Sequence, residues 1–333
     1  MKYIKILIIL FSPFFVGWVS LFIGSYEISP VMVLKVLLNE TLHVFDVQDI
    51  PEKAIIWDIR LPRILTAFLV GASLSGAGVT LQAIFRNPLV DPFILGISAG
   101  AAFGCAITVG FLEALPIQLM AFIFAILAVA LAYFIARTHG EVDRLSLVLS
   151  GVIISSFFTA LVSIVKFLVD PHRLQSIVYW LMGSFSLSDW GTLKWIFPGI
   201  LVSFFPLFLM RWRLNVLSMG EEEAKMLGLD VGKERAIFII FSTLGVATAT
   251  SVCGIIGWVG LMVPHLIRMM IGPDHKVLLP LSFCGGGAFM IAADTLSRTL
   301  TSFDIPVGII TALTGAPFFI YLMKKCGKEV WGR

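Results

Sequence analysis

The chain is organised as long apolar runs separated by short connections that carry charges or turn residues. A helix needs about 20 predominantly apolar residues to cross the hydrocarbon core of a bilayer, and runs near that length recur along the whole chain. The pattern therefore predicts an all-α, polytopic membrane protein with a single transmembrane domain over residues 1–333. Ten transmembrane helices are predicted, at about 5–24, 63–84, 93–111, 115–136, 146–168, 193–210, 236–254, 257–271, 278–297 and 306–323.

The composition supports the same interpretation. Of the 333 residues, 58% are hydrophobic and 14% are charged, and the mean hydropathy is +0.97, which is too apolar for a protein that folds in water. The connections leave no room for a soluble catalytic domain, so we expect no enzymatic activity and no cofactor bound by this chain. The first run is too long for the apolar region of a signal peptide, and we expect it to be a retained helix.

The cysteines and histidines give no pattern of a disulfide framework or a metal site. The four cysteines show neither a C-x-x-C motif nor a metal-ligand spacing to histidine, so they are interpreted as packed thiols. His265 follows Pro264 in a predicted span, where it is interpreted as part of a helix-breaking site rather than as a metal ligand. The cysteines are Cys105, Cys253, Cys284 and Cys326.

The distribution of basic residues predicts the orientation. If the N-terminus is cytoplasmic, 16 of the 24 Lys and Arg residues fall in inner connections or at inner helix ends. The positive-inside rule then places both termini in the cytoplasm of a multi-pass protein of the cell membrane. Trp180, Trp190 and Trp195 gather around the outer ends of the fifth and sixth spans, where aromatic side chains favour the membrane interface.

Small residues spaced four apart predict close helix packing. The third span carries Gly96, Gly100 and Gly104, and the second span carries Gly71 with Ser75. Lipid provides no hydrophobic force between helices, so such ridges allow the backbones to approach closely. Packing alone and lining of a pathway both remain open for them. Gln82 is expected to form a hydrogen bond between helices.

Asp294 is the one acidic residue that we place inside a predicted span. Arg298 lies four residues later on the same helical face, so a local ion pair is predicted. Ion-coupled transporters normally use several acids or histidines at membrane depth, which this pattern does not offer. An ion-coupled secondary transporter is therefore the less favoured alternative.

The longest inner connection, at about 214–233, contains a short helix with clear end signals. Ser218 and Glu221 match a capping box, further acids follow, and Gly228 provides a stop for a helix of two or three turns. This helix could rest against the bundle or fit a groove on a cytoplasmic partner. The chain lacks the G-x-x-x-x-G-K-[ST] motif, so any ATP must be bound and hydrolysed by a second polypeptide.

Several segments, in order along nearly the whole chain, resemble the FecCD-type permeases of ABC importers for iron-siderophores, haem and vitamin B12. The matching segments are Ile59 to Arg63, Gly78 to Leu89, Asp91 to Gly100, Gly257 to Arg268, Gly272 to Lys276, Ala293 to Arg298, Pro306 to Gly308 and Thr314 to Pro317. The resemblance implies a type II ABC importer (BtuC-like) permease fold of ten helices. It also implies a dimer with an identical or similar permease, two cytoplasmic subunits that bind ATP and Mg, and a substrate-binding protein on the outer side.

The resemblance also implies roles for individual residues. Arg60, Arg63 and Arg298 correspond to arginines that engage acidic residues of the binding protein. Residues expected to couple the permease to the ATPase are Ser218, Gly220, Glu221, Glu222, Ala224, Leu227 and Gly228. Those expected to line the pathway and its outer gate, in a short helix after the fifth span, are Gln175, Ser176, Tyr179 and Ser184.

The expected function is import of a metal chelate by alternating access, with iron(III)-siderophore as the first cargo. Cobalamin, haem and molybdate are the alternatives within the same class of importer. A non-transporting membrane scaffold is a further alternative, in which the inner helix serves only assembly. Neither the cargo nor the identity of the second permease follows from the sequence.

Overall fold

The computed structural model describes residues 2–24, 26–42, 51–138, 141–301 and 303–326. These residues are nearly all helical, which confirms the predicted all-α fold. Within them, seven helices are long and apolar enough to cross a membrane, and three shorter apolar helices account for the remaining predicted spans. The elements in chain order are α1 (Lys2–Phe22), α2 (Pro30–Leu42), α3 (Pro51–Lys53), η1 (Ala54–Arg60), α4 (Leu61–Phe85), η2 (Pro92–Leu95), α5 (Ile97–Phe111), α6 (Ile117–Ala136), β1 (Arg137–Thr138), β2 (Glu141–Val142), α7 (Arg144–Leu168), α8 (Pro171–Leu181), α9 (Trp190–Met219), α10 (Glu221–Met226), α11 (Val231–Cys253), α12 (Val259–Ile271), α13 (His275–Ser297) and α14 (Val307–Cys326).

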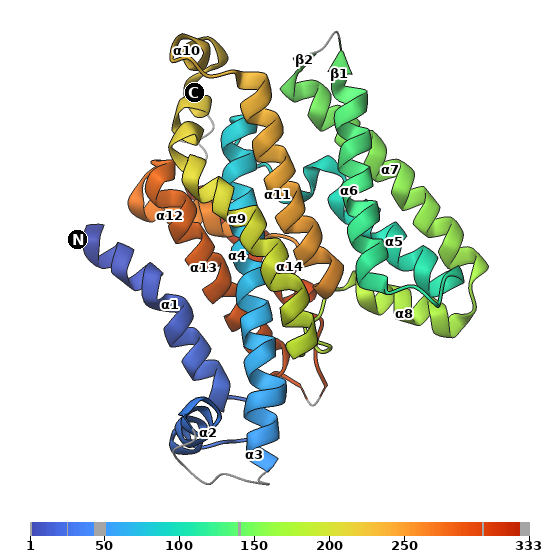
Figure 1. Ribbon diagram of the computed structural model, residues 1–333, viewed down its shortest axis with the longest axis vertical. Helices are drawn as coiled ribbons and strands as arrows, with labels where there is room; N and C mark the ends of the chain where they lie inside the picture. Colours follow the sequence, from blue (N-terminus) through green and yellow to red (C-terminus); the bar gives the residue numbers. More distant parts are fainter. Residues whose placement is uncertain (1, 25, 43–50, 139–140, 302, 327–333) are drawn as a thin grey trace.

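Helix α4 lies at the centre of the bundle and packs against α9, α11, α12 and α13, whereas α5, α6 and α7 form a group on one side (Figure 1). Nearly every residue of α4 is buried. Small residues allow this close packing, because a Cβ built on Gly71 would lie only 2.2 Å from the carbonyl oxygen of Gly286 in α13. The core is therefore built by backbone approach as much as by large side chains.

The connections gather at two opposite ends of the bundle. Helix α10 and the antiparallel pair β1–β2 lie at one end, which we call the α10 end, and α2 and α3 lie at the opposite end, the α2 end (Figure 1). The predicted inner connection at about 214–233 thus lies at the same end of the bundle as β1 and β2.

The three glycines predicted to form one ridge in the third span face two different helices. Cβ atoms built on Gly100 and Gly104 would lie 2.3 and 2.4 Å from the carbonyl oxygens of Phe124 and Met120 in α6. Gly96, however, is not part of the ridge, because it precedes α5 with a φ of +89° and faces α7. It serves as a left-handed turn residue between η2 and α5, a conformation that glycine adopts without strain.

Two helices extend beyond the predicted spans. The second predicted span begins earlier, because the helical segment starts at Pro51 and passes through the π-helical turns of η1 into α4. Helix α9 continues past residue 210 to Met219. Helix α2 was not predicted at all, because its 13 residues are too short to span a membrane.

Candidate functional site

Three arginines that were predicted to dock the binding protein lie at the α2 end, between α1, η1–α4 and α13. Arg60, Arg63 and Arg298 are each no more than 8% exposed. Arg60 donates a hydrogen bond of 2.6 Å to the carbonyl oxygen of Leu21, and Arg298 donates one of 2.7 Å to the hydroxyl of Ser20. The guanidinium groups of Arg60 and Arg298 thus both bind the end of α1.

Asp294 is the carboxylate at the centre of this arginine cluster. Its side chain is 1% exposed and accepts hydrogen bonds from Nε and Nη2 of Arg63 at 2.9 and 2.8 Å. Arg63 also donates from Nη1 to Asp304 at 2.6 Å. The predicted pair with Arg298 is present at the longer distance of 3.8 Å. The closer partner, Arg63, lies 231 residues away in sequence, so helical spacing could not reveal it.

Because the three arginines are buried and paired with groups of the same chain, they do not form an exposed basic surface in this conformation. Their docking role stays a prediction, and it requires that the cluster open or exchange its partners. A charge-assisted, bidentate pair such as that of Arg63 with Asp294 is strong and geometrically specific.

The four residues predicted to line the pathway lie in one cavity. Gln175, Ser176 and Tyr179 come from α8, and Ser184 follows it. The cavity has a volume of about 400 Å³, and its remaining lining is mostly apolar. The remaining residues are Val109, Ile117, Trp180, Leu187, Val252 and Cys253. The predicted set therefore shares one hollow, with walls from α5, α6 and α11 that the sequence did not indicate.

Polar contacts hold α8 in place beside this cavity. Asp170 caps its first turn, and the backbone N–H of Arg173 donating to that carboxylate lowers the pKa of Asp170. The guanidinium of Arg173 in turn contacts Asp170 at 3.1 Å, donates to the carbonyl oxygen of Gly110 at 2.5 Å and pairs with Glu113. Helix α8 is thereby tied to the end of α5 and to the loop that follows it.

At the α10 end, the structure corrects one prediction about the short helix. Ser218 is not its cap, because α9 continues to Met219 and the Ser218 hydroxyl donates to the carbonyl oxygen of Asn215 within α9. Gly220, with extended backbone, separates the two helices and precedes α10. The predicted stop is present, since Gly228 has a φ of +81° and follows the last turn of α10.

Helix α10 has one face on the bundle and one face in solvent. Ala224 is fully buried, and Glu221 is half-buried against neighbouring helices. The apolar side chains of Met226 and Leu227 are 80% and 62% exposed. Glu222 is also exposed, so the outward face combines apolar and acidic groups.

Several residues of the motif segments have structural roles. Gln82 donates to the carbonyl oxygen of Gly260 at 3.2 Å and accepts from Arg268 at 2.8 Å, so it joins α4 to α12 as predicted. His265 lies inside α12 beside Pro264. In the described part of the chain, no three His, Cys, Asp or Glu side chains are grouped so that they could hold a metal ion.

The three cysteines whose side chains the structure describes are separate free thiols. Cys105 and Cys253 are buried and Cys284 is partly buried. The side chain of Cys326 lies outside the described residues.

Comparison with known proteins gives a consistent family assignment. The model of the FecCD transport family matches residues 9–325. A probable iron chelatin transport system permease protein of Helicobacter pylori is 43% identical over 92% of this chain and 93% of its own length. The molybdate import system permease protein MolB of Haemophilus influenzae is 40% identical over 93% of each chain.

A solved structure has the same fold. It is an inward-facing conformation of a transporter assigned to the metal-chelate ABC type. It superposes with a TM-score of 0.85 at 38% identity, covering 96% of this chain and 99% of that one.

Proposed function

Because the chain belongs to the FecCD transport family, we propose that it is the membrane-spanning permease subunit of an ABC importer for a metal chelate. Iron(III)-siderophore is the first candidate cargo, and cobalamin, haem and molybdate are the alternatives. The observation that carries the proposal is the family match over residues 9–325. It is supported by relatives of about equal length that are named as transport or import system permease proteins, and by the fold shared with a metal-chelate type ABC transporter.

The proposed assembly contains two permeases, two cytoplasmic ATPase subunits and a substrate-binding protein. The α10 end faces the cytoplasm of a plasma or inner membrane, with both chain termini on that side. The exposed face of α10, with Met226 and Leu227, fits a groove of the ATPase. This assignment is supported by the two-faced character of α10 and by the absence of an ATP-binding motif from the chain.

In the proposed cycle, ATP draws the two ATPase subunits together and the resulting movement reaches the bundle through α10. The pathway then opens toward the binding protein, and hydrolysis resets it. The cavity beside α8 is the candidate part of this pathway. Its polar groups include the amide of Gln175, the hydroxyls of Ser176, Tyr179 and Ser184 and the indole N–H of Trp180. None of the described residues that line it carries an ionised side chain.

A weakly polar lining suits passage of a bulky chelate without tight binding. Selection of the cargo then belongs mainly to the binding protein. Two relatives of similar sequence identity to this chain are named for iron chelatin and for molybdate, so sequence identity does not determine the cargo.

The docking role proposed for Arg60, Arg63 and Arg298 includes an exchange of partners. Acidic residues of the arriving binding protein replace Asp294 and Asp304 as ligands of the guanidinium groups. The partial exposure of Asp304, at 32%, makes it the carboxylate nearest to solvent in this cluster.

The function is tested by uptake into proteoliposomes that contain the permease, its ATPase and the binding protein. Uptake of ferric siderophore should require ATP on the ATPase side and should disappear with a hydrolysis-deficient ATPase. A protonophore or sodium ionophore should leave it unchanged, which separates an ABC importer from an ion-coupled transporter. Parallel assays with cobalamin, haem and molybdate identify the cargo. Uptake that follows an ion gradient without ATP would contradict the proposal.

A further inference from the structure

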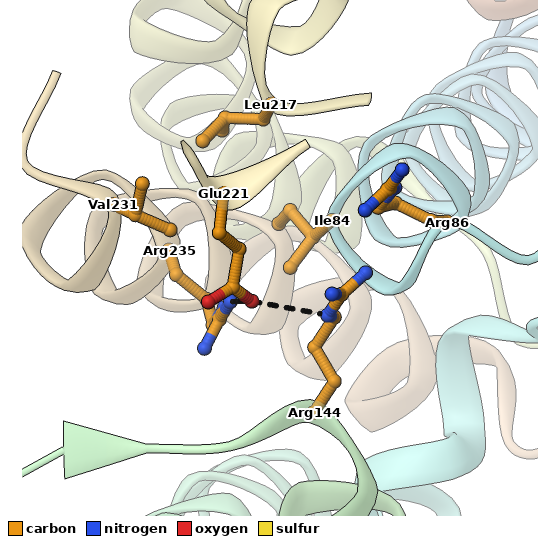
Figure 2. A pocket seen from close by; sticks show the side chains of 7 residues that line it. All are labelled: Ile84, Arg86, Arg144, Leu217, Glu221, Val231 and Arg235. Carbon is orange, nitrogen blue, oxygen red and sulfur yellow. Dashed lines mark hydrogen bonds and ion pairs between the residues drawn. The ribbon is translucent and has the colours of Figure 1, made fainter. Parts of the chain in front are cut away.

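One carboxylate oxygen of α10 contacts two arginines from different parts of the bundle. Oε1 of Glu221 lies 2.6 Å from Nη2 of Arg235 and 3.2 Å from Nε of Arg144. Figure 2 shows the two guanidinium groups converging on this carboxylate at the edge of a small cavity. We call Glu221, Arg144 and Arg235 the Glu221 clamp.

The two arginines connect α10 to separate elements. Arg235 belongs to α11, is 8% exposed at its side chain and also donates to the carbonyl oxygen of Val142 in β2. Arg144 is the first residue of α7, and Asp143 before it caps that helix. A displacement of Glu221 is therefore opposed by α11 through one contact and by the start of α7 through the other.

Helix α7 extends from the clamp toward the candidate pathway. It contains 25 residues, which corresponds to about 37 Å of helix. Only Val169 and Asp170 separate its far end from α8, whose residues Gln175 and Ser176 line the cavity. A continuous helix is one of the rigid elements that can carry a displacement between two distant sites.

Resting on the proposed function, we infer that Glu221 is a positioning residue that couples the ATPase to the pathway through the clamp. Its contacts with Arg144 and Arg235 make α7 and α11 follow α10 when the ATPase moves it. In this way the movement of a six-residue surface helix reaches α8 on the other side of the bundle.

The two contacts of the clamp differ in burial. The side chains of Glu221 and Arg144 are 39% and 28% exposed, so water screens this pairing more than the pairing with Arg235. Arg235 is more deeply buried and provides the fixed side. Helix-dipole stabilisation does not depend on Glu221 alone, because Glu222 and Glu223 lie in the same first turn.

The test measures cargo transported per ATP hydrolysed in proteoliposomes that contain the complete importer. E221Q removes the shared carboxylate charge with little change of shape. R144Q removes the contact between Glu221 and α7 by a substitution that lies outside α10. The matched comparison is E223Q, which removes a charge from the same turn, and K276Q is the control for R144Q. Neither Glu223 nor Lys276 forms a side-chain ion pair within the described segments.

E221Q and R144Q should each lower the coupling ratio by about threefold to tenfold while ATP hydrolysis and subunit assembly persist. The double variant should be no worse than E221Q alone, because the residues act as one unit. E223Q and K276Q should retain the wild-type ratio. A reduction confined to assembly would instead indicate a purely structural role and would overturn the inference.

Wild-type coupling in both E221Q and R144Q would also overturn it. If E221Q does not assemble, R144Q provides the test, because Arg144 lies outside α10. A wild-type coupling ratio in R144Q would then contradict the inference. Failure of the proposed function is recognised separately, since the wild-type complex would then show no ATP-dependent uptake.

Discussion

Replacing Asp294 by Asn should destabilise the protein strongly. The substitution removes the charge that accepts hydrogen bonds from Nε and Nη2 of Arg63, at 2.8 to 3.1 Å, in a site where Asp294 is 1% exposed. Breaking a buried ion pair typically costs about 3–5 kcal/mol, because the remaining charge is left without its partner. Arg63 keeps Asp304 at 2.6 Å, so we expect a loss near the lower limit, about 3 kcal/mol.

The assay is the apparent free energy of unfolding of the purified permease in mixed micelles, titrated with a denaturing detergent. The matched control is D58N, since Asp58 is an exposed acid at the same end of the molecule and should change stability by no more than about 0.5 kcal/mol. The double variant R63M/D294L removes both charges and should be more stable than D294N. Equal stability of D294N and D58N would refute the reasoning.

Three further predictions concern packing, the cavity and a helix cap. Gly71→Ala should cost about 1–3 kcal/mol in the same unfolding assay, because its Cβ would lie 2.2 Å from a carbonyl oxygen of α13. Gly257→Ala should be tolerated, because its Cβ would have no neighbour within 4 Å among the described residues. Gln175→Trp should fill the cavity and lower uptake roughly tenfold without loss of ATPase binding. The control Phe167→Trp, at an 88% exposed position, should leave uptake unchanged. Equal uptake by the two variants would contradict the pathway assignment. Asp143 accepts hydrogen bonds from the backbone at the start of α7, chiefly from Ser146, and these lower its pKa. Its stabilisation is therefore present above its ordinary pKa of about 3.9 and is lost as the pH falls through the lower folded value, so Asp143→Ala should be less stable than wild type at pH 7 and the difference should shrink at low pH. A difference that is constant with pH would contradict this ionic cap.

The membrane-spanning helices could be predicted from the sequence because lipid requires every backbone polar group to be bonded within the protein. Long apolar runs then have few alternatives to a helix, and the predicted runs all correspond to helices of the structure. The residues at which the helices begin and end were harder to predict. Ser218 carries a valid local cap signal, but the chain contains no helix breaker between residue 207 and Gly220, so α9 continues through it.

The arginine cluster shows why the site was only partly predictable. Helical spacing indicates the pair of Asp294 and Arg298, but the stronger contact of Asp294 is with Arg63, which tertiary packing alone brings close. Sequence could place the arginines at one end of the bundle but could not show that they are buried. Likewise, the resemblance indicated the α8 side of the cavity, whereas its walls from Val109 and Val252 depend on how α5 and α11 pack.

The most direct test of the central claim is the side of the membrane on which α10 lies. Met226→Cys places a thiol at an 80% exposed position of that helix, and it is introduced where the four native cysteines, Cys105, Cys253, Cys284 and Cys326, are replaced by Ala, so that the cysteine-free protein is the control for reactivity. A membrane-impermeant maleimide should label M226C in inside-out vesicles, and bound ATPase should protect it. Labelling of M226C in right-side-out vesicles would contradict the assignment of α10 as the contact with a cytoplasmic ATPase.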